Sequence, residues 1–230
     1  MIISHKYKFI FLKTTKTAGT SIEIALSKFC GSRDIITPLV SEDEEIRKNL
    51  GFRDPQNYMS RPWQYSIKDV VRFLQRGHRQ QRFHHHMSAR DVRELVSRKI
   101  WKTYFKFCVE RNPWDRLVSL YYWMYRLKPP PTFSDFVRSE FPFRLNQKGF
   151  GIYTIDGKIA VDKICRFENL ENELEEIRMQ LGIPEKLVLP RAKSQFRKDL
   201  KGYREYFNVE ERARIEEIFS DEINLLGYEF

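Results

Sequence analysis

The chain has 230 residues, of which 41% are hydrophobic and 14% aromatic, a composition that excludes intrinsic disorder and suits one globular domain over residues 1–230. Its 41 lysines and arginines against 31 acidic residues give a net charge of +10, which favours an anionic ligand. Three cysteines exclude a disulfide framework, and no apolar run reaches the ~18 to 20 residues of a membrane span or resembles a signal peptide, so we expect a cytoplasmic protein without a transmembrane segment.

The N-terminal part of the chain predicts a strand, a loop and a helix. Residues 8–12 form an apolar run of strand length, and apolar residues between positions 20 and 29 recur at helical spacing. A break at Gly31 precedes a second strand, predicted over 34–39. Residues 41–60 are polar without a clear period and predict an irregular surface excursion.

The middle of the chain predicts helices followed by a buried strand. A helix is expected over 67–77, and the next begins after Ser88, because Ser88 with Asp91 three residues later resembles a capping box ahead of an apolar stripe. Residues 103–109 are rich in aromatic and apolar side chains and predict a buried strand.

The rest of the chain continues the alternation of helices and strands. Its predicted elements are a helix over 115–126, a short helix over 132–139, a hairpin turn at Asp156 and Gly157, a strand over 161–167, a helix over 170–181 ended by Gly182, and a C-terminal helix through Ile215 and Leu226. Cys108 and Cys165 lie inside predicted strands and are expected to be buried. Strands separated by helices imply an α/β fold with a mainly parallel central sheet covered on both faces.

The loop after the first predicted strand, residues 13–21, has the composition of an anion site. A helix N-terminus offers backbone amides and a partial positive charge, and Gly19 lets a ligand approach the backbone closely. The residues expected to contact a phosphate-like anion, through amides, hydroxyls or a mobile cation, are Lys16, Thr17, Ala18, Gly19, Thr20 and Ser21. An ordinary strand-to-helix turn with Thr20 as N-cap is the structural alternative.

Two other classes of function are alternatives to an anion-binding transferase loop. A nucleotide-hydrolysing P-loop requires a lysine directly after its second glycine, whereas Lys16 precedes the only glycine of the loop, Gly19. Magnesium-dependent hydrolysis therefore loses its main support, and a nucleotide kinase or NTPase is kept as an alternative. A basic nucleic-acid-binding protein is a second alternative, but no helix-turn-helix, zinc or RNA-binding signature supports it, and we expect no nucleic-acid partner.

A second candidate anion site follows the strand predicted over 103–109. Arg111 ends that strand, and Ser119 lies eight residues further on, about two turns into the next helix. Both can face one anion at the carboxyl edge of the sheet, where open α/β sheets bind their ligands. Pairing of Arg111 with acidic neighbours is the structural alternative. We expect the strands 8–12 and 104–109 to lie side by side, so that the two loops meet.

The two loops resemble motifs of the sulfotransferase family that uses 3'-phosphoadenosine 5'-phosphosulfate (PAPS). Residues 15–21 resemble its 5'-phosphosulfate loop, with Thr15 where proline is usual, and residues 111–119 reproduce its 3'-phosphate motif Arg-Asn-Pro-aromatic-Asp-Arg-x-x-Ser. Similarity extends to residues 162–170 and to the closing Gly-Tyr-Glu-Phe, and it is greatest to the bacterial branch related to carbohydrate sulfotransferases. The resemblance implies a single sulfotransferase domain built as a P-loop-like three-layer sandwich.

The resemblance also implies a reaction and a set of roles. A sulfuryl group would pass in line from PAPS, the co-substrate, to an acceptor hydroxyl, expected on a glycan or glycoconjugate, without a metal. Lys16 is the expected catalytic cation at the leaving phosphate, residues 17–21 hold the 5'-phosphosulfate, and Arg111 and Ser119 hold the 3'-phosphate.

A catalytic base is expected among three adjacent histidines. A hydroxyl becomes a competent nucleophile as its proton leaves, and histidine suits that role at neutral pH. His86 with Ser88 and Ala89 resembles the family's His-x-Thr/Ser-Ala segment, so His86 is the predicted base, and His84 and His85 are the alternatives. Adjacent histidines rarely give the tetrahedral geometry of zinc, and no metal site is expected.

Two basic segments are candidates for further contacts. Residues that could line an acceptor cleft or equally form a surface cap are Arg53, Arg61, Trp63, Tyr65, Arg72, Arg76 and Arg79. Residues of the late basic stretch that could cover the nucleotide or remain solvated are Arg191, Lys193, Ser194, Arg197, Lys198 and Lys201.

Overall fold

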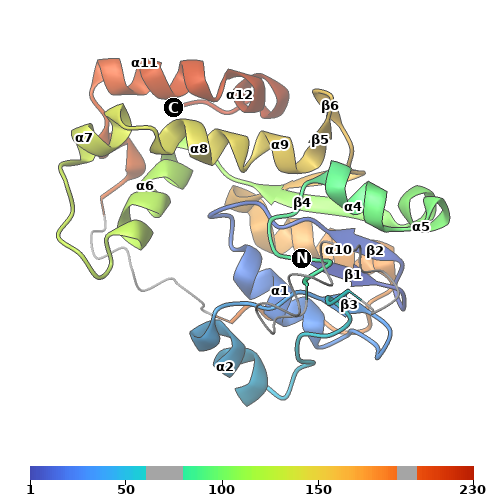
Figure 1. Ribbon diagram of the computed structural model, residues 1–230. Coiled ribbons are helices and arrows are strands. Elements are labelled where there is room, and N and C mark those ends of the chain that lie inside the picture. Colours follow the sequence, from blue (N-terminus) through green and yellow to red (C-terminus); the bar gives the residue numbers. More distant parts are fainter. Residues whose placement is uncertain (61–79, 191–200) are drawn as a thin grey trace.

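The computed structural model describes residues 1–60, 80–190 and 201–230, and it contains a five-stranded sheet in the order β3-β1-β2-β4-β7 (Figure 1). The strands are β1 (Ile2–Ser4), β2 (Phe9–Phe11), β3 (Ile35–Ile36), β4 (Phe105–Glu110) and β7 (Lys163–Arg166). β2, β4 and β7 pair in parallel, and β1 runs antiparallel to its neighbours β2 and β3. The predicted mainly parallel sheet is therefore confirmed.

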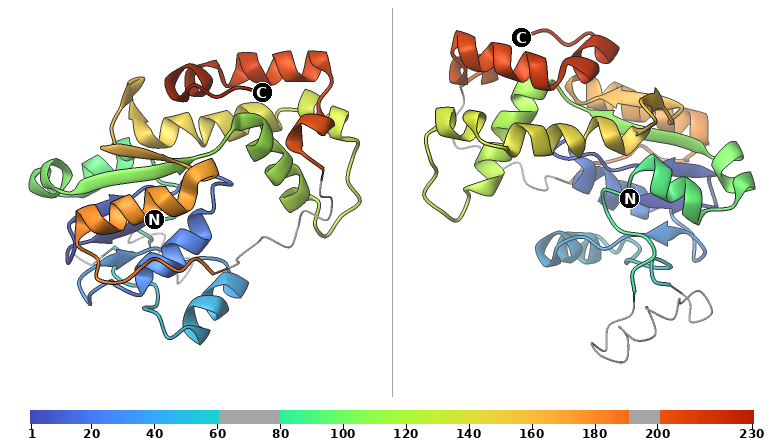
Figure 2. Two further views of the ribbon diagram at one scale, coloured as in Figure 1. Left: turned by 180° about the vertical axis from the view of Figure 1, so that it is seen from behind. Right: turned by 45° about the horizontal axis from the view of Figure 1, so that its top comes forward.

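Helices cover both faces of this sheet because side chains of a strand alternate between faces. Phe9 and Phe11 point into a core shared with α1 (Gly19–Ser27) and α10 (Leu170–Leu181). Ile10 and Leu12 point to the opposite side, where the core includes residues of α4 (Ala89–Leu95), α5 (Arg98–Thr103) and α9 (Phe150–Tyr153). Figure 2 shows α10 and α1 together on one side of the strands. An α/β architecture flanked by helices follows, while its P-loop-like character stays a prediction.

A third, helical core lies beyond the carboxyl end of β4, where the chain enters α6 (Pro113–Met124). It is formed by α6 together with α7 (Phe133–Arg138), α8 (Phe141–Gln147), the 3-10 turn η3 (Tyr203–Tyr206), α11 (Val209–Ile218) and α12 (Ser220–Leu226). Trp114 of α6 packs edge to face on Phe230, with ring centroids 5.4 Å apart. The second candidate loop is therefore held between the sheet and a separate aromatic core.

Several local predictions are confirmed. The hairpin joins β5 (Thr154–Ile155) to β6 (Lys158–Ile159), and both turn residues, Asp156 and Gly157, have positive φ, as a tight hairpin turn requires. The Ser88 side chain accepts a hydrogen bond from the Asp91 amide at the start of α4. Gly182 ends α10 with φ of 65°. Cys108 and Cys165 are buried in β4 and β7.

The prediction of an irregular excursion over 41–60 is wrong, because α2 (Ser41–Asn49) occupies its first part. This helix buries only the polar residues Asp43 and Arg47, so it lacks the apolar period by which helices are recognised. Its acidic first turn and basic last turn favour a helix through the helix dipole.

Some predicted boundaries are also wrong. The strand expected from Thr103 begins at Phe105, because α5 extends through Thr103. The strand expected over 34–39 is only the two residues of β3. The single C-terminal helix is two helices that meet at Phe219. α5, α8 (Phe141–Gln147), α9 and β1 were not predicted.

The helix expected over 67–77 lies outside the described residues. So do the candidate contact residues Arg61, Trp63, Tyr65, Arg72, Arg76, Arg79, Arg191, Lys193, Ser194, Arg197 and Lys198. Of the remaining candidates, Arg53 donates to the Cys30 carbonyl at 2.8 Å and so supports the loop after α1, and Lys201 is exposed. None of the helices in the described ranges combines the length and apolarity that crossing a bilayer requires.

Candidate functional site

The two candidate loops lie side by side. β2 and β4 are adjacent and parallel, with Phe11 opposite Phe107, so the loops that follow them start at the same edge of the sheet (Figure 1). The predicted adjacency of the strands is thus confirmed. Loops at the carboxyl edge of a parallel sheet are the usual place for ligand binding in open α/β folds.

The first loop, Lys13–Ser21, has the backbone of an anion-binding nest. Lys16 and Ala18 both have left-handed backbone angles, with φ of 66° and 59°, and Ala18 is the N-cap of α1. Alternation of right- and left-handed residues turns successive amides toward one concave side. The first turn of a helix adds amides that have no partner inside the helix. An anionic group fits this arrangement.

Three threonine hydroxyls of the loop have different surroundings. Thr14 donates to the Val109 carbonyl at the end of β4, so its oxygen accepts the proton of Thr17 across 2.7 Å. Thr17 was predicted to donate this hydroxyl to the anion, but here the proton is committed within the loop. By contrast, Thr15 Oγ1 is buried and has no hydrogen-bond partner among the described residues, as expected of a group that meets a ligand.

Lys13 and Lys16 have different environments. Lys13 is buried, forms an ion pair with Glu23 of α1, and lies under Gly19, where an added Cβ would stand 2.7 Å from Lys13 Cγ. The half-buried Lys16 instead places its Nζ 5.3 Å from the centroid of the Trp123 ring on α6. Sequence reasoning missed the Lys13–Glu23 pair, although a carboxylate among the apolar residues of α1 was a visible signal.

Arg111 joins the second loop to the first. Its guanidinium donates to Asp115 at 2.8 Å, reaches the Lys16 carbonyl at 3.4 Å, and stacks 4.2 Å above the Phe167 ring. The pairing with an acidic neighbour, considered as an alternative to anion binding, is therefore present. The Asp115 carboxylate also holds the Arg111 guanidinium against the first turn of α6.

Ser119 lies on the face of α6 that is turned toward the first loop. Asp115, Ser119 and Trp123 follow one another at four-residue spacing and so share one side of the helix. Asp115, one turn before Ser119, accepts from Arg111, which also donates to the Lys16 carbonyl. Trp123, one turn after Ser119, contacts the Lys16 ammonium. This orientation is compatible with the predicted phosphate contact of Ser119, which stays a prediction.

Asn112 and Glu168 fix the geometry of the second loop. The Asn112 side chain caps α6 by accepting from the amides of Trp114 and Asp115, and its amide group donates to the Glu229 carbonyl at 2.9 Å. Its backbone N–H donates to Glu168 at 2.7 Å. Glu168 therefore organises the loop from β7's side.

His86 lies against the first loop, as predicted, because its Nδ1 is 2.8 Å from the Lys13 carbonyl. A carbonyl only accepts, so Nδ1 carries the proton and Nε2 has the lone pair. Burial lowers the pKa of His86 to about 3, and the Lys13 ammonium acts in the same direction. The imidazole is therefore neutral at neutral pH with Nε2 as its basic atom. His84 and His85 are exposed.

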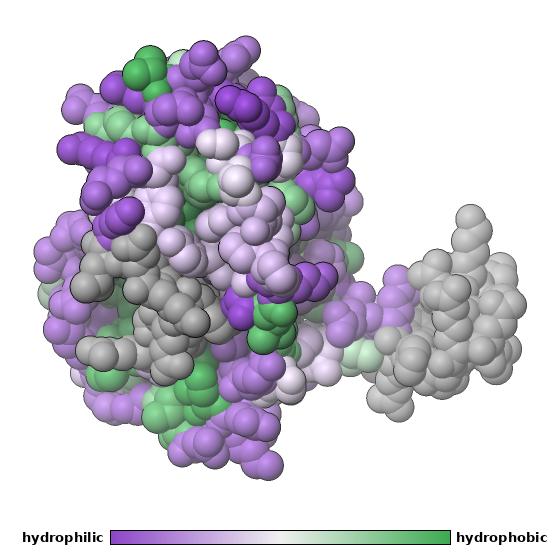
Figure 3. Space-filling view, turned by 90° about the vertical axis from the view of Figure 1, so that its left-hand side faces the viewer, coloured by the Kyte–Doolittle hydropathy of each residue, from purple (hydrophilic) through white to green (hydrophobic). Residues whose placement is uncertain are grey.

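Arg111 and His86 both contact backbone carbonyls of the first loop, Arg111 at Lys16 and His86 at Lys13, and the role of these residues and of the Lys16 ammonium stays a prediction. Two cations and a helix N-terminus can hold a dianionic ligand, and a neutral imidazole beside them can accept a proton. Within the described parts of the chain, no group of three or more His, Cys, Asp or Glu side chains is arranged to hold a metal ion. On the described part of the face shown in Figure 3, hydrophilic side chains predominate and hydrophobic ones form small separate groups.

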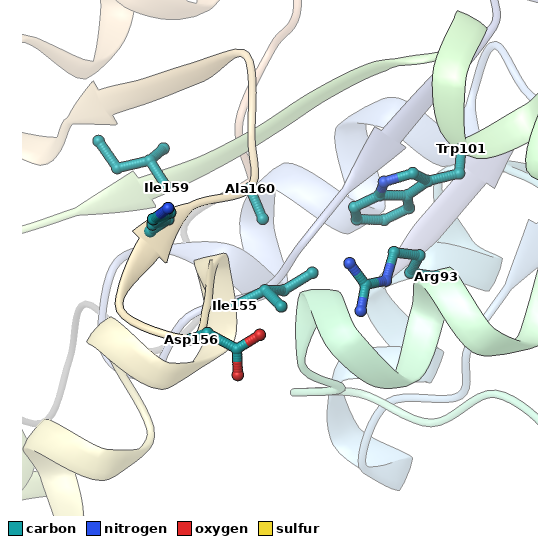
Figure 4. A pocket seen from close by; sticks show the side chains of 7 residues that line it. Arg93, Trp101, Ile155, Asp156, Ile159 and Ala160 are labelled. Atoms are coloured by element: carbon teal, nitrogen blue, oxygen red, sulfur yellow. The ribbon is translucent and has the colours of Figure 1, made fainter.

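A pocket of about 350 Å³ lies elsewhere, between α4, α5 and the β5–β6 hairpin. The Trp101 indole and the Arg93 guanidinium face the hairpin across it (Figure 4). None of the candidate site residues lines this pocket, and α5 leads into the amino end of β4, opposite to the end that carries Arg111. The pocket is therefore separate from the candidate site.

Similarity to a known protein family extends over almost the whole chain. The sequence pattern that describes the sulfotransferase family matches residues 1–229. An uncharacterized protein of Archaeoglobus fulgidus is 35% identical over 104 residues, which make up 44% of this chain and 87% of that protein. The family match includes both loops, His86 and β7.

Proposed function

Because the chain belongs to the sulfotransferase family, we propose that it moves the sulfuryl group of PAPS to an acceptor hydroxyl on a carbohydrate. One observation carries the proposal: Arg111 of the second loop reaches the carbonyl of Lys16 in the first, and His86 lies on the same loop through Lys13. Residues suited to the 3'-phosphate and to the acceptor proton are thus both connected to the loop that would hold the phosphosulfate.

The first loop would hold the phosphosulfate. Its backbone amides, turned inward by the left-handed Lys16 and Ala18, suit the non-bridging oxygens, and the Thr15 hydroxyl, which has no partner in the described parts of the chain, is a further donor. When bound, PAPS supplies an activated sulfuryl group with adenosine 3',5'-bisphosphate as leaving group. The Lys16 ammonium would neutralise the negative charge that develops on the leaving phosphate oxygen.

Arg111 and Ser119 would hold the 3'-phosphate. A guanidinium oriented by Asp115 and stacked on Phe167 keeps a fixed direction, so little freedom is lost when an anion binds. The residues at the start of α6 would then hold the 3'-phosphate end of the ligand, and those at the start of α1 would hold the phosphosulfate end.

His86 would take the proton of the acceptor hydroxyl. Its tautomer leaves Nε2 as the acceptor, and its lowered pKa keeps that atom unprotonated at neutral pH. As negative phosphosulfate binds nearby, the electrostatic cost of protonating the ring falls. The half-buried Trp123 ring, which Lys16 and Arg126 contact, is a candidate for packing against the sugar ring of a carbohydrate acceptor.

The test compares ligand binding and transfer in single variants. We expect adenosine 3',5'-bisphosphate to raise the melting temperature, whereas ATP with Mg²⁺ does not. Lys16→Ala should lower kcat about 10²-fold or more, His86→Ala should lower kcat about 10²-fold to 10⁴-fold with little change in ligand affinity, and Arg111→Ala should weaken the bisphosphate about 10-fold to 100-fold.

The matched control is Lys28→Ala, which removes an exposed cation paired with Glu185. It should behave as the wild type. Stabilisation by ATP with Mg²⁺ and not by the bisphosphate would instead identify a kinase or NTPase. Wild-type transfer rates in all three site variants would contradict the assigned roles.

A further inference from the structure

A buried cluster of charges lies directly behind the second loop. It consists of Glu110, the last residue of β4, Arg116 of α6 and Glu222 of α12, with side chains no more than 1% exposed. Arg116 Nη1 donates to Glu110 and, at 3.2 Å, to Glu222, while its Nη2 donates to the Leu145 carbonyl at 2.8 Å. The cluster therefore connects β4, α6, α8 and α12.

The cluster is linked to the site through the backbone of Arg111. The Arg111 amide donates to the Glu110 carboxyl at 3.3 Å, and Arg116 follows on the second turn of the same motif. Packing around the ions is tight: a methyl group at Gly149 would overlap both the Arg116 guanidinium and the Glu222 carboxylate. Small displacements in the cluster are thus transmitted to Arg111.

Charge in the cluster does not balance if both carboxyl groups are ionised. Two carboxylates then face one guanidinium in the protein interior, which leaves an excess negative charge that burial strongly disfavours. Three buried polar atoms of this region lack hydrogen-bond partners among the described residues: Glu110 Oε1, Arg116 Nε and the Tyr153 hydroxyl of α9. A single proton on Glu110 would remove the excess charge.

We propose that Glu110 is protonated in the folded protein at neutral pH and acts in that form as a positioning residue for Arg111 and the 3'-phosphate. This inference rests on the proposed function. Glu110 Oε2 still accepts from Arg116 and from the Arg111 amide, and Oε1 carries the proton. Ionisation would place a negative charge one residue from the guanidinium that meets the phosphate.

The electrostatic surroundings agree with this assignment. Burial raises the pKa of Glu110 to about 8, with Glu222 acting in the same direction and Arg116 opposing it. Other titratable groups that act on the cluster are Tyr153 of α9, Cys108 of β4, Asp221 of α12, and Tyr228 near the C-terminus. The pKa values of Tyr153 and Cys108 are raised, chiefly by burial, so these two groups stay neutral. Burial raises the pKa of Glu222 as well, but both Glu222 oxygens accept hydrogen bonds, from Arg116 and from the Phe150 amide, whereas Glu110 Oε1 accepts none among the described residues. The proton is therefore assigned to Glu110, and its ionisation adds charge as pH rises.

The experiment is calorimetric binding of adenosine 3',5'-bisphosphate to the full chain between pH 7 and 9.5. In the wild type, the dissociation constant should rise about 5-fold to 10-fold as pH increases through about 8. Glu110→Gln, which is neutral and keeps the size of the side chain, should bind within about twofold of the wild type at pH 7 and lose the alkaline rise.

A second variant, Glu222→Gln on α12, changes the net charge of the same cluster. Glu222→Gln leaves one carboxylate for one guanidinium, so the alkaline rise should also disappear. Glu185→Gln, at an exposed position, is the control and should keep it. In steady-state transfer assays at pH 9, Glu110→Gln should lower KM for PAPS relative to the wild type without changing kcat.

Infrared spectroscopy tests the proton without any ligand. The wild type should show a buried protonated-carboxyl band at pH 7 that is lost at pH 9 and is absent from Glu110→Gln. Absence of that band, or an alkaline rise that persists in Glu110→Gln, would overturn the proposal. Failure of the wild type to bind the bisphosphate at any pH would instead overturn the proposed function, and the infrared band would still decide the state of Glu110.

Discussion

The Lys13 side chain packs directly against the backbone of Gly19, so there is no room for a side chain at position 19. Lys13 is held from one side by its ion pair with Glu23, and its Cγ, close to the backbone, is the atom that an added Cβ at Gly19 would meet. The Lys13 carbonyl also accepts from His86. A change at this point therefore affects both the anion loop and the histidine.

Gly19→Ala should destabilise the protein by about 1–3 kcal/mol, because a buried, ion-paired lysine stem cannot move aside cheaply. It should also weaken binding of adenosine 3',5'-bisphosphate. Urea denaturation and calorimetry measure the two effects. Gly151→Ala, in α9 with nothing within 4 Å of the added Cβ, is the control and should be neutral or stabilising. Equal stability of the two variants would contradict the described packing.

His86 should remain neutral far below the pH at which an ordinary histidine gains its proton. Burial lowers its pKa to about 3, so its ring signals in NMR spectra should not titrate between pH 8 and 5 in the ligand-free protein. The His86→Asn variant identifies the signals. A midpoint near pH 6.5 would show that the ring is solvated and not held against the Lys13 carbonyl.

Helix α6 carries the second loop, and its N-cap joins it to distant parts of the chain. Asn112 is buried, accepts from the first-turn amides, and donates to the Glu229 carbonyl. The capping role could be inferred from Asn112-Pro113 in the sequence, since proline is favoured in the first turn. The contact with the C-terminal residues could not.

Asn112→Ala should lower the free energy of unfolding by about 1–2 kcal/mol, because it removes a helix cap and the hydrogen bond to the Glu229 carbonyl. The matched control is Thr132→Ala, which removes the exposed N-cap of α7 and should cost about 0.5–1 kcal/mol. Urea denaturation of both variants gives the difference. Bisphosphate affinity should fall in Asn112→Ala only, since α7 carries no predicted ligand contact.

The stability of the whole molecule should depend on pH through His86. Its pKa is about 3 in the folded state against 6.5 for the unperturbed group, so the unfolded chain binds more protons in that interval. The free energy of unfolding should therefore fall as pH decreases from about 6.5 toward 3. His86→Gln should reduce this slope in denaturant titrations at several pH values, and an unchanged slope would assign it to other groups.

Much of the fold was predictable from local patterns. The apolar run before Lys13, the cap at Ser88, the turn at Asp156 and Gly157, and the stop at Gly182 are each set by neighbours within a few residues. α2 was not predicted because it buries the polar residues Asp43 and Arg47 and has no apolar stripe. The lengths of β3 and β4 were misjudged, since pairing with neighbouring strands decides where a strand begins and ends.

Spacing and residue type were enough to identify the family motifs, to predict that the two loop-bearing strands are adjacent, and to select Lys16, Arg111 and His86 as candidates. The pairing of polar groups became visible in the three-dimensional arrangement alone: Lys13 pairs with Glu23, the Thr17 hydroxyl with Thr14, and Arg116 with Glu110 and Glu222. The physical reason is that burial and ion pairing depend on distances between segments far apart in the chain, and these distances set the pKa values of His86 and Glu110.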